Sequence, residues 1–166
     1  MTGLGRGFRL LLVGASLSLL WACATPERQA LAPGESVWEG RLALLVNGNP
    51  PQSLSAGFEL RGSARRGELT LNSPLGQALA VADWNEHGAR LRQGGNEQRY
   101  ASVDDMTTAL TGTPLPLAAL FDWLQGRAQT PEGWEVDLSG HADGRLLARR
   151  LQPLPSAELR LRFSAP

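Results

Sequence analysis

The sequence contains no lysine, one cysteine and two histidines, and its 166 residues carry no net charge. The absence of lysine excludes a lysine nucleophile and Schiff-base chemistry. A single cysteine can form neither an internal disulfide nor a cysteine-based zinc site, and two histidines argue against a multi-histidine metal centre. The balance of 16 basic and 16 acidic residues argues against a nucleic-acid-binding protein, which needs an excess of positive charge. The length fits one domain.

The single cysteine, Cys23, follows a segment that is typical of a secretory signal. Arg6 and Arg9 precede residues 10–22, a run of 13 residues without a charge. Such a run is too short to span a bilayer, which takes about 20 apolar residues. It has the length and the basic flank of a signal peptide.

The end of this run, Leu20-Trp21-Ala22-Cys23, resembles the bacterial lipoprotein signal. Trp21 departs from the small residue that is usual there, so an ordinary cleaved signal that happens to contain a cysteine is the alternative. The resemblance implies a signal peptide over 1–22 and an N-acyl and S-diacylglycerol lipid on Cys23. The resemblance also implies that Ala24, a residue other than Asp, permits sorting to the outer membrane. Residues 23–36 are rich in Pro, Glu and small residues and are predicted to form a lipidated tether.

The remaining residues, 37–166, are predicted to form one mainly β domain. Apolar and polar side chains alternate with period two, which is typical of half-buried antiparallel strands. Turn residues separate the strands at 62–67, 73–76, 85–88 and 94–96. Three further strands are expected at 134–138, 145–151 and 157–163, the first two joined through Asp143-Gly144.

Two short helices are predicted between these groups of strands. Ser102 is the predicted N-cap of a first helix that ends before Gly112. A second helix begins at Pro116 and carries apolar residues with helical spacing, at 117, 120, 121 and 124, before Gly126.

The residues that could support catalysis do not form a recognisable site. Asp104 and Asp105 are adjacent and would lie on different sides of a helix. His87 and His141 are expected to be solvated turn residues, and the pair at 149–150 is expected to be two solvated arginines at a strand end. No nucleophile elbow, phosphate loop or metal-ligand spacing is present. We therefore expect no enzyme, no metal and no cofactor other than the lipid.

The turn Ser73-Pro74-Leu75-Gly76 is unusual because an apolar residue occupies its tip. Pro74 presets φ for a turn and Gly76 provides conformational freedom at its end. Leu75 could fold back onto the core, or it could be an exposed tip that contacts another apolar phase.

Several motifs together resemble the LolB family. They are Trp38-x-Gly-Arg-Leu, the Leu69–Gly76 hairpin, Tyr100-x-Ser, Leu110-Thr-Gly-Thr-Pro-Leu-Pro-Leu and Leu120-x-x-Trp-Leu-x-Gly126, in this order. The resemblance covers residues 38–126. It implies an unclosed antiparallel β-barrel or half-barrel, with helices that form a lid over a hydrophobic cavity.

The resemblance also implies a function. A LolB protein is a monomer anchored by its lipid to the periplasmic face of the outer membrane. It accepts lipoprotein cargo from the carrier LolA and inserts that cargo among outer-membrane lipids without nucleotide hydrolysis. Pro74, Leu75 and Gly76 map onto the loop that delivers cargo to the membrane. The acyl-cavity candidates are Leu42, Leu44, Phe58, Leu60, Leu69, Leu71, Leu117, Leu120 and Phe121.

Two departures from the family leave alternatives open. Fewer than 40 residues follow the helical region and its short connection, so one or two C-terminal strands of the family are expected to be missing or abbreviated, and the usual N-terminal helix is reduced to the tether. The alternatives are a non-transferring scaffold lipoprotein of the envelope and a soluble periplasmic acyl-chain carrier whose Cys23 is not acylated.

Replacing Cys23 tests the lipid anchor. We expect Cys23→Ser to yield an uncleaved or soluble periplasmic product, because each buried acyl CH₂ contributes about 0.8 kcal/mol to membrane binding and the variant lacks every acyl chain. Fractionation of cells beside the wild type measures this. Unchanged recovery of the variant in the membrane fraction would contradict the anchor.

Overall fold

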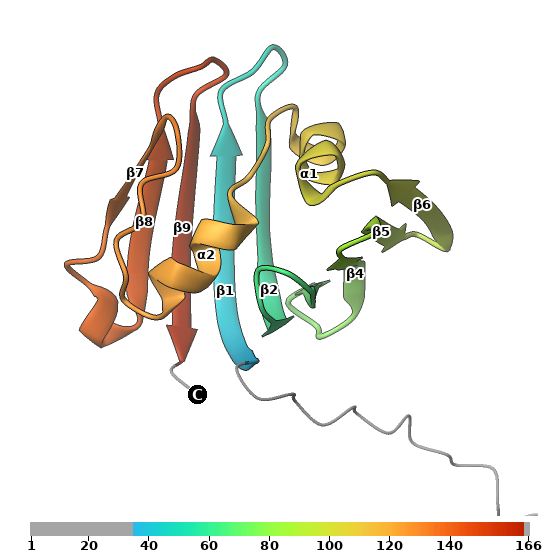
Figure 1. Cartoon of the computed structure of the whole chain (residues 1–166), viewed down its shortest axis with the longest axis horizontal. Helices are drawn as coiled ribbons and strands as arrows, with labels where there is room; N and C mark the ends of the chain where they lie inside the picture. Colours follow the sequence, from blue (N-terminus) through green and yellow to red (C-terminus); the bar gives the residue numbers. More distant parts are fainter. Residues whose placement is uncertain (1–34, 165–166) are drawn as a thin grey trace, which may run out of the picture. The chain divides into compact units, whose positions relative to one another are not determined.

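The computed structural model describes residues 35–164, so the signal peptide, Cys23 and most of the tether lie outside the described residues. Within this range, nine strands form one antiparallel sheet in the order β6-β5-β4-β3-β2-β1-β9-β8-β7 (Figure 1). The strands are β1 (Ser36–Val46), β2 (Gln52–Gly62), β3 (Gly67–Asn72), β4 (Ala78–Asn85), β5 (Gly88–Gln93), β6 (Asn96–Tyr100), β7 (Trp134–Asp137), β8 (Arg145–Arg150) and β9 (Ala157–Ser164). The helices are α1 (Val103–Thr111) and α2 (Leu117–Leu124).

The central strands follow the alternation of the sequence. Leu42 pairs with Ala56, and Leu44 with Leu54, so the buried side chains of β1 and β2 share one face of the sheet. β9 continues this face on the other side of β1, where Leu42 pairs with Leu161. The opposite face carries most of the charged side chains of these strands. A sheet with one apolar and one charged face must cover only the apolar one.

The sheet is unclosed, because β6 and β7 are its two edges and do not pair with each other. α2 crosses the apolar face over β9 and β1, and α1 lies beside β5 and β6 (Figure 1). The predicted fold, an open half-barrel with a helical lid, is therefore confirmed. The three C-terminal strands lie where the sequence predicts them.

The ends of α1 are fixed by caps that the sequence predicts. The Ser102 side-chain oxygen accepts a hydrogen bond of 3.0 Å from the backbone N–H of Asp105. At the other end, Gly112 adopts a left-handed conformation with φ of 72° and donates its N–H to Thr108 O. Neither α1, with nine residues, nor α2, with eight, is long enough to cross a bilayer, and no other helix of residues 35–164 is.

α2 is held on the sheet by aromatic contacts on both of its sides. Phe121 packs edge-on against Trp84 of β4, with ring centroids 6.2 Å apart. Trp123 is fully buried and packs against Trp134 of β7, also at 6.2 Å. Each such pair contributes about 0.5–1.5 kcal/mol beyond the burial of its area. α2 therefore links strands from the two halves of the sheet.

Two sequence predictions about polar residues are wrong. His141 is half-buried: its Nε2–H donates to Leu124 O over 2.9 Å, and its ring packs against Phe163 at 5.3 Å. It therefore caps the end of α2. Arg150 is 3% exposed, and its guanidinium donates to Pro155 O over 2.8 Å. Burial lowers the pKa of Arg150. His87 is exposed, as the sequence predicts.

The close approach of β1 and β9 gives a test of the sheet. An alanine Cβ at Gly40 would lie 1.9 Å from Arg162 O and 2.8 Å from Phe163 Cα, so the strands would have to separate. We expect Gly40→Ala to lower the free energy of unfolding by about 1–3 kcal/mol in urea denaturation.

Gly57→Ala is the matched control, because its Cβ would lie 3.6 Å from its nearest neighbour in Asn72, an ordinary contact. That variant should be neutral or stabilised by about 0.4–1 kcal/mol. Equal destabilisation of the two variants would contradict the account of the β1–β9 contact.

Candidate functional site

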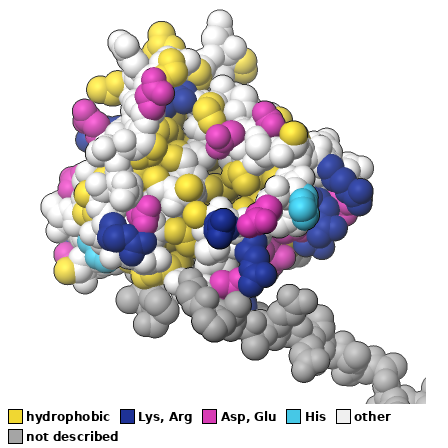
Figure 2. Space-filling view, viewed as in Figure 1, with side chains coloured by type: hydrophobic (Ala, Val, Ile, Leu, Met, Phe, Trp, Pro, Cys, Tyr) yellow, Lys and Arg dark blue, Asp and Glu magenta, His cyan; other side chains and the backbone are white. Residues whose placement is uncertain are grey.

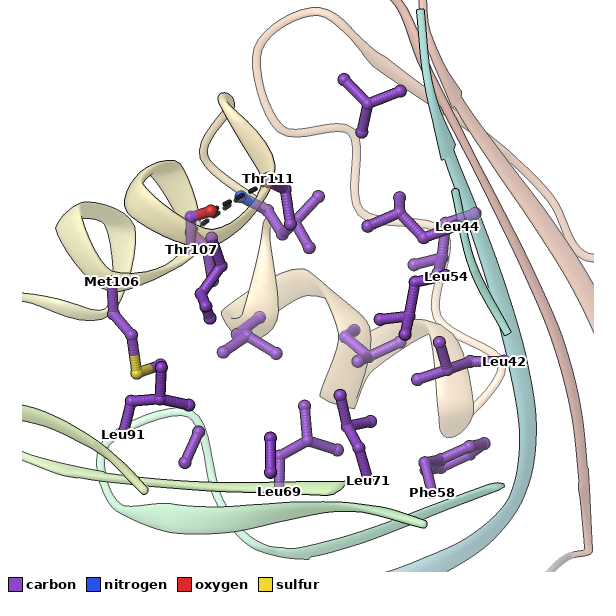
Figure 3. A pocket seen from close by; sticks show the side chains of 18 of the residues that line it. Leu42, Leu44, Leu54, Phe58, Leu69, Leu71, Leu91, Met106, Thr107 and Thr111 are labelled. Carbon is purple, nitrogen blue, oxygen red and sulfur yellow. Dashed lines mark hydrogen bonds between the residues drawn. The ribbon is translucent and has the colours of Figure 1, made fainter. Parts of the chain in front are cut away.

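The concave face of the sheet and the two helices enclose a cavity of about 420 Å³. Figure 3 shows side chains of β1 and β2 on one side, those of β3 below, and those of β5 and α1 on the other side. This volume lies within the range of about 300–1,000 Å³ that is typical of sites for small apolar ligands. The apolar residues of its wall are Leu42, Leu44, Val46, Leu54, Phe58, Leu69, Leu71, Leu79, Ala80, Ala82, Leu91, Met106, Leu110, Leu115, Pro116, Leu117, Leu120, Leu159 and Leu161.

Most of the predicted cavity residues lie in this wall. Those that line the cavity are Leu42, Leu44, Phe58, Leu69, Leu71, Leu117 and Leu120. The other two do not: Leu60 is fully buried in the packed core, and Phe121 faces Trp84. That acyl chains occupy the cavity stays a prediction.

The sequence prediction missed cavity residues from four other elements, one of which is β4 with Leu79, Ala80 and Ala82. Leu159 and Leu161 come from β9, Leu91 from β5 and Met106 from α1. The strand alternation of β9 and the helical spacing of α1 contain the signal that these side chains face inward. Their place in the same wall depends on the strand order, which sets β9 beside β1.

No ionisable side chain of the described residues lines the cavity. The polar residues of its wall are neutral: Gln52, Ser53, Gln93, Thr107 and Thr111. Of these, Gln52, Ser53 and Gln93 are exposed and belong to its rim. A charged group would lose its hydration in such a cavity without gaining a partner. The interior is therefore suited to a hydrocarbon chain.

Thr107 joins α1 to the segment that leads into α2. Its hydroxyl accepts a hydrogen bond of 3.0 Å from the N–H of Leu115, drawn as a dashed line in Figure 3. The same hydroxyl lies 3.2 Å from Asp104 O, to which it donates. Thr107 is buried, so this bond is shielded from water. The two helices of the lid are thus connected through one side chain.

Two exposed leucines mark the mouth of the cavity. Leu79, at the start of β4, is 43% exposed, and Leu110, near the end of α1, is 39% exposed, although both line the cavity. In Figure 2, apolar side chains gather at the centre of the helix-bearing face, with most charged side chains around them. The cavity is thus accessible to an apolar ligand from the surface.

The turn between β3 and β4 presents Leu75 to solvent, with 87% of the side chain exposed. The turn is closed by hydrogen bonds from the N–H of Gly76 to Ser73 O and from the N–H of Ser73 to Gln77 O, of 2.9 and 2.8 Å. Gly76 has φ of 80°, which favours glycine. The backbone therefore directs Leu75 outward, and the alternative in which it folds onto the core is excluded.

Several charged side chains form ion pairs on the outer face of the sheet. Arg90 donates to both carboxylate oxygens of Asp83, its cross-strand neighbour, over 2.8–3.0 Å. On β9, Glu158 accepts hydrogen bonds from Arg149 and Arg160, and these hold the pKa of its carboxyl below the usual range. Charge is thus kept away from the cavity.

A curved, unclosed antiparallel sheet with two helices over a charge-free apolar cavity defines a class of cavity-bearing half-barrel proteins. Residues 37–160 match the family model described as outer membrane lipoprotein LolB. The chain belongs to the LolB family of outer-membrane lipoproteins, which act in lipoprotein localisation, and its location is the outer membrane.

Three relatives named outer-membrane lipoprotein LolB illustrate the similarity. The protein from Bordetella petrii is 26% identical over 176 residues, covering 90% of this chain and 88% of the relative. The protein from Ralstonia nicotianae is 32% identical over 136 residues, covering 76% and 65%. The protein from Cupriavidus necator is 35% identical over 130 residues, covering 74% and 66%. The matched part of this chain thus spans about two thirds of the length of the last two relatives.

The hydrogen bond of Thr107 gives a test of the lid. Thr107→Val keeps the shape of the side chain but leaves the N–H of Leu115 without its acceptor, so we expect the free energy of unfolding to fall by about 1–3 kcal/mol. Thr108→Val is the matched control, because Thr108 is exposed on the same helix. Chemical denaturation of both variants checks this, and equal stabilities would show that the bond contributes nothing.

Proposed function

We propose that this protein accepts acylated lipoproteins from the periplasmic carrier LolA and inserts them into the outer membrane without hydrolysing a nucleotide. The acyl chains of the cargo occupy the cavity between the sheet and the two helices, and the protein moiety of the cargo stays outside. The observation that carries the proposal is the cavity wall, which is apolar and free of ionisable side chains. Its family membership supports the same role.

The energetics of acyl chains explain how cargo could move without an energy source. Burying one CH₂ contributes about 0.8 kcal/mol in any apolar environment. The free energy of an acyl chain therefore changes little when the chain moves between two cavities that bury it equally. The free energy of the acyl chain falls when the next environment buries the chain more completely. A cavity with an exposed mouth at Leu79 and Leu110 covers a chain less completely than a bilayer does. Cargo would therefore pass onward to the membrane.

The cavity also supports lipid handling over the scaffold alternative. A scaffold lipoprotein needs no interior cavity, and a cavity in the core lowers the stability of the folded protein. The wall of leucines around about 420 Å³ therefore favours a lipid-handling protein over a scaffold. An acylated Cys23 would distinguish the anchored receptor from a soluble carrier. Cys23 lies outside the described residues.

Leu75 would act at the moment of delivery. Burying one leucine contributes about 1.5–3 kcal/mol, far less than several acyl chains contribute to a permanent anchor. A tip of this strength can enter and leave the membrane repeatedly. Its place on a hydrogen-bonded turn, with 87% of the side chain exposed, lets it contact lipid without rearrangement of the sheet.

Leu75→Glu separates the receipt of cargo from its delivery. Because the cavity wall does not include Leu75, we expect the variant to take cargo from the carrier as the wild type does. Insertion of that cargo into vesicles should fall about tenfold or more, since a carboxylate opposes entry into lipid. A reconstituted assay that follows cargo from the carrier, through this protein, to the vesicle fraction measures both steps.

Leu75→Met is the control for the substitution itself and should retain insertion, because methionine is also apolar. Insertion by Leu75→Glu at the wild-type rate would refute the role of the tip. Failure of the wild type to remove cargo from the carrier would refute the proposed function as a whole.

A further inference from the structure

Six large hydrophobic side chains are exposed in the part of the chain that the structure describes. All of them lie at or near connections that leave the same end of the strands, or near the end of α1. In an antiparallel sheet, alternate connections leave the same end of the strands, as the β1–β2, β3–β4, β5–β6 and β8–β9 connections do here. We call this end of the sheet, with residues 47–51, 73–77, 94–95 and 151–156, the loop edge. Leu75, Leu151 and Leu154 are exposed within these connections. Leu45 and Leu79 are exposed within two residues of a connection, and Leu110 is exposed beside the end of α1.

The end of α1 belongs to the same region of the molecule. Thr111 and Gly112 border one surface depression together with Asn47–Pro50 and Leu154–Pro155. The mouth residue Leu110 directly precedes them. The mouth of the cavity, the end of α1 and the loop edge are therefore neighbours.

The β8–β9 connection forms a second apolar tip, which lies beside the β1–β2 connection (Figure 1). Leu154 is 80% exposed and Leu151 is 63% exposed. Residues 151–156 carry no charged side chain. Three hydrogen bonds hold the connection in place. Arg150 donates to Pro155 O over 2.8 Å, the N–H of Asn47 donates to Ser156 O over 2.9 Å, and the side-chain amide of Asn47 donates to the Ser156 hydroxyl over 3.0 Å.

We propose that Leu151 and Leu154 form a second membrane-contact site, which enters the boundary between lipid headgroups and acyl chains together with Leu75. The proposal extends the proposed function, because it rests on delivery of cargo at a membrane. With contacts at two separated tips, the loop edge and the cavity mouth beside it would be held toward the bilayer. Cargo would then leave the cavity directly into lipid.

The chemistry of the tip fits a lipid phase better than a protein partner. Leu151 and Leu154 project from the surface, and the depression that Leu154 borders is also lined by polar residues such as Asn47, Asn49 and Gln52, which do not suit the apolar side chains of a partner. Pro153 and Pro155 lack an N–H, as do Pro50 and Pro51 in the adjoining β1–β2 connection. Fewer backbone donors must therefore lose their water when the tip enters an apolar phase.

The charged neighbours limit how deep each side chain would enter. Glu132 borders the same surface depression as Leu151, so Leu151 would stay near the headgroups. Leu154 borders a depression that contains no ionisable residue, and it would enter furthest. Arg149 is paired with Glu158 on β9 and would remain in water.

The length of the chain before β1 allows this orientation. Ser36 begins β1 at the edge opposite the loop edge, and Cys23 is 13 positions before it. Thirteen residues span at most about 45 Å, whereas the 11 residues of β1 rise about 37 Å. A lipid on Cys23 and the loop edge could therefore reach the same membrane.

The experiment uses the full-length lipidated protein in vesicles of phosphatidylethanolamine and phosphatidylglycerol. With Cys23 acylated, an introduced cysteine is the only free thiol, and the wild type reports background labelling. A polarity-sensitive fluorophore is attached at Leu154→Cys, at Leu75→Cys and at His87→Cys. His87 is exposed in the β4–β5 turn at the opposite edge and is the matched control.

We expect a blue-shifted emission and quenching by lipid-borne quenchers for the label at position 154, and neither for the label at position 87. Equal exposure of these two labels to water would overturn the second contact site. If the label at position 75 were still quenched by lipid, the proposed function would stand without the second contact site. If neither label entered lipid, the membrane step of the proposed function would fail as well. Shielding at position 154 only on addition of the carrier would indicate a protein partner and also overturn the proposal.

A second measurement tests whether the two tips act together. Leu151→Glu combined with Leu154→Glu should lower the membrane-embedded fraction of the label at position 75 about tenfold or more. Both leucines are largely exposed, so the fold should be retained, which circular dichroism checks. His87→Glu should leave that fraction unchanged. An unchanged fraction in the double variant would show that Leu75 enters the membrane alone.

Discussion

The packing of α2 across the apolar face of the sheet is the interaction on which the cavity depends. An apolar cavity costs stability roughly in proportion to its volume, so the leucines around it would gain by collapsing together. Phe121 holds α2 against Trp84, and Trp123 holds it against Trp134, so the helix cannot move inward without losing one of these contacts. His141 fixes the last turn of the helix. The interior thus stays open because its lid is held on both sides.

The sequence predicts the elements well, because alternation and helix caps are local signals. The alternation in β1 and β2 and the Ser102 cap of α1 are found where expected. The sequence predicts the cavity wall less well, because an inward-facing apolar side chain can belong either to a cavity wall or to a packed core. Leu120 lines the cavity while its neighbour Phe121 packs on Trp84. That difference depends on where α2 sits, which only the tertiary structure sets.

The polar residues that the sequence misplaced have structural roles at chain reversals. His141 donates to the backbone carbonyl of Leu124, 17 residues earlier in the chain, and Arg150 donates to that of Pro155 within the β8–β9 connection. A turn-rich local sequence cannot indicate such partners. In the folded protein, charge lies on the outer face, the cavity wall is neutral, and exposed leucines gather at the loop edge. This separation places the cavity mouth beside the surface best suited to lipid.

The central claim is that the cavity between the sheet and the helices holds the acyl chains of the cargo. A lipoprotein cargo with a photoactivatable group on an acyl chain tests it most directly, by crosslinking during transfer and identification of the modified residues. The account predicts crosslinks to wall residues such as Leu44, Leu71 and Leu120, from three different elements. Crosslinks confined to the outer face of the sheet, around Arg41 or Arg90, would contradict it.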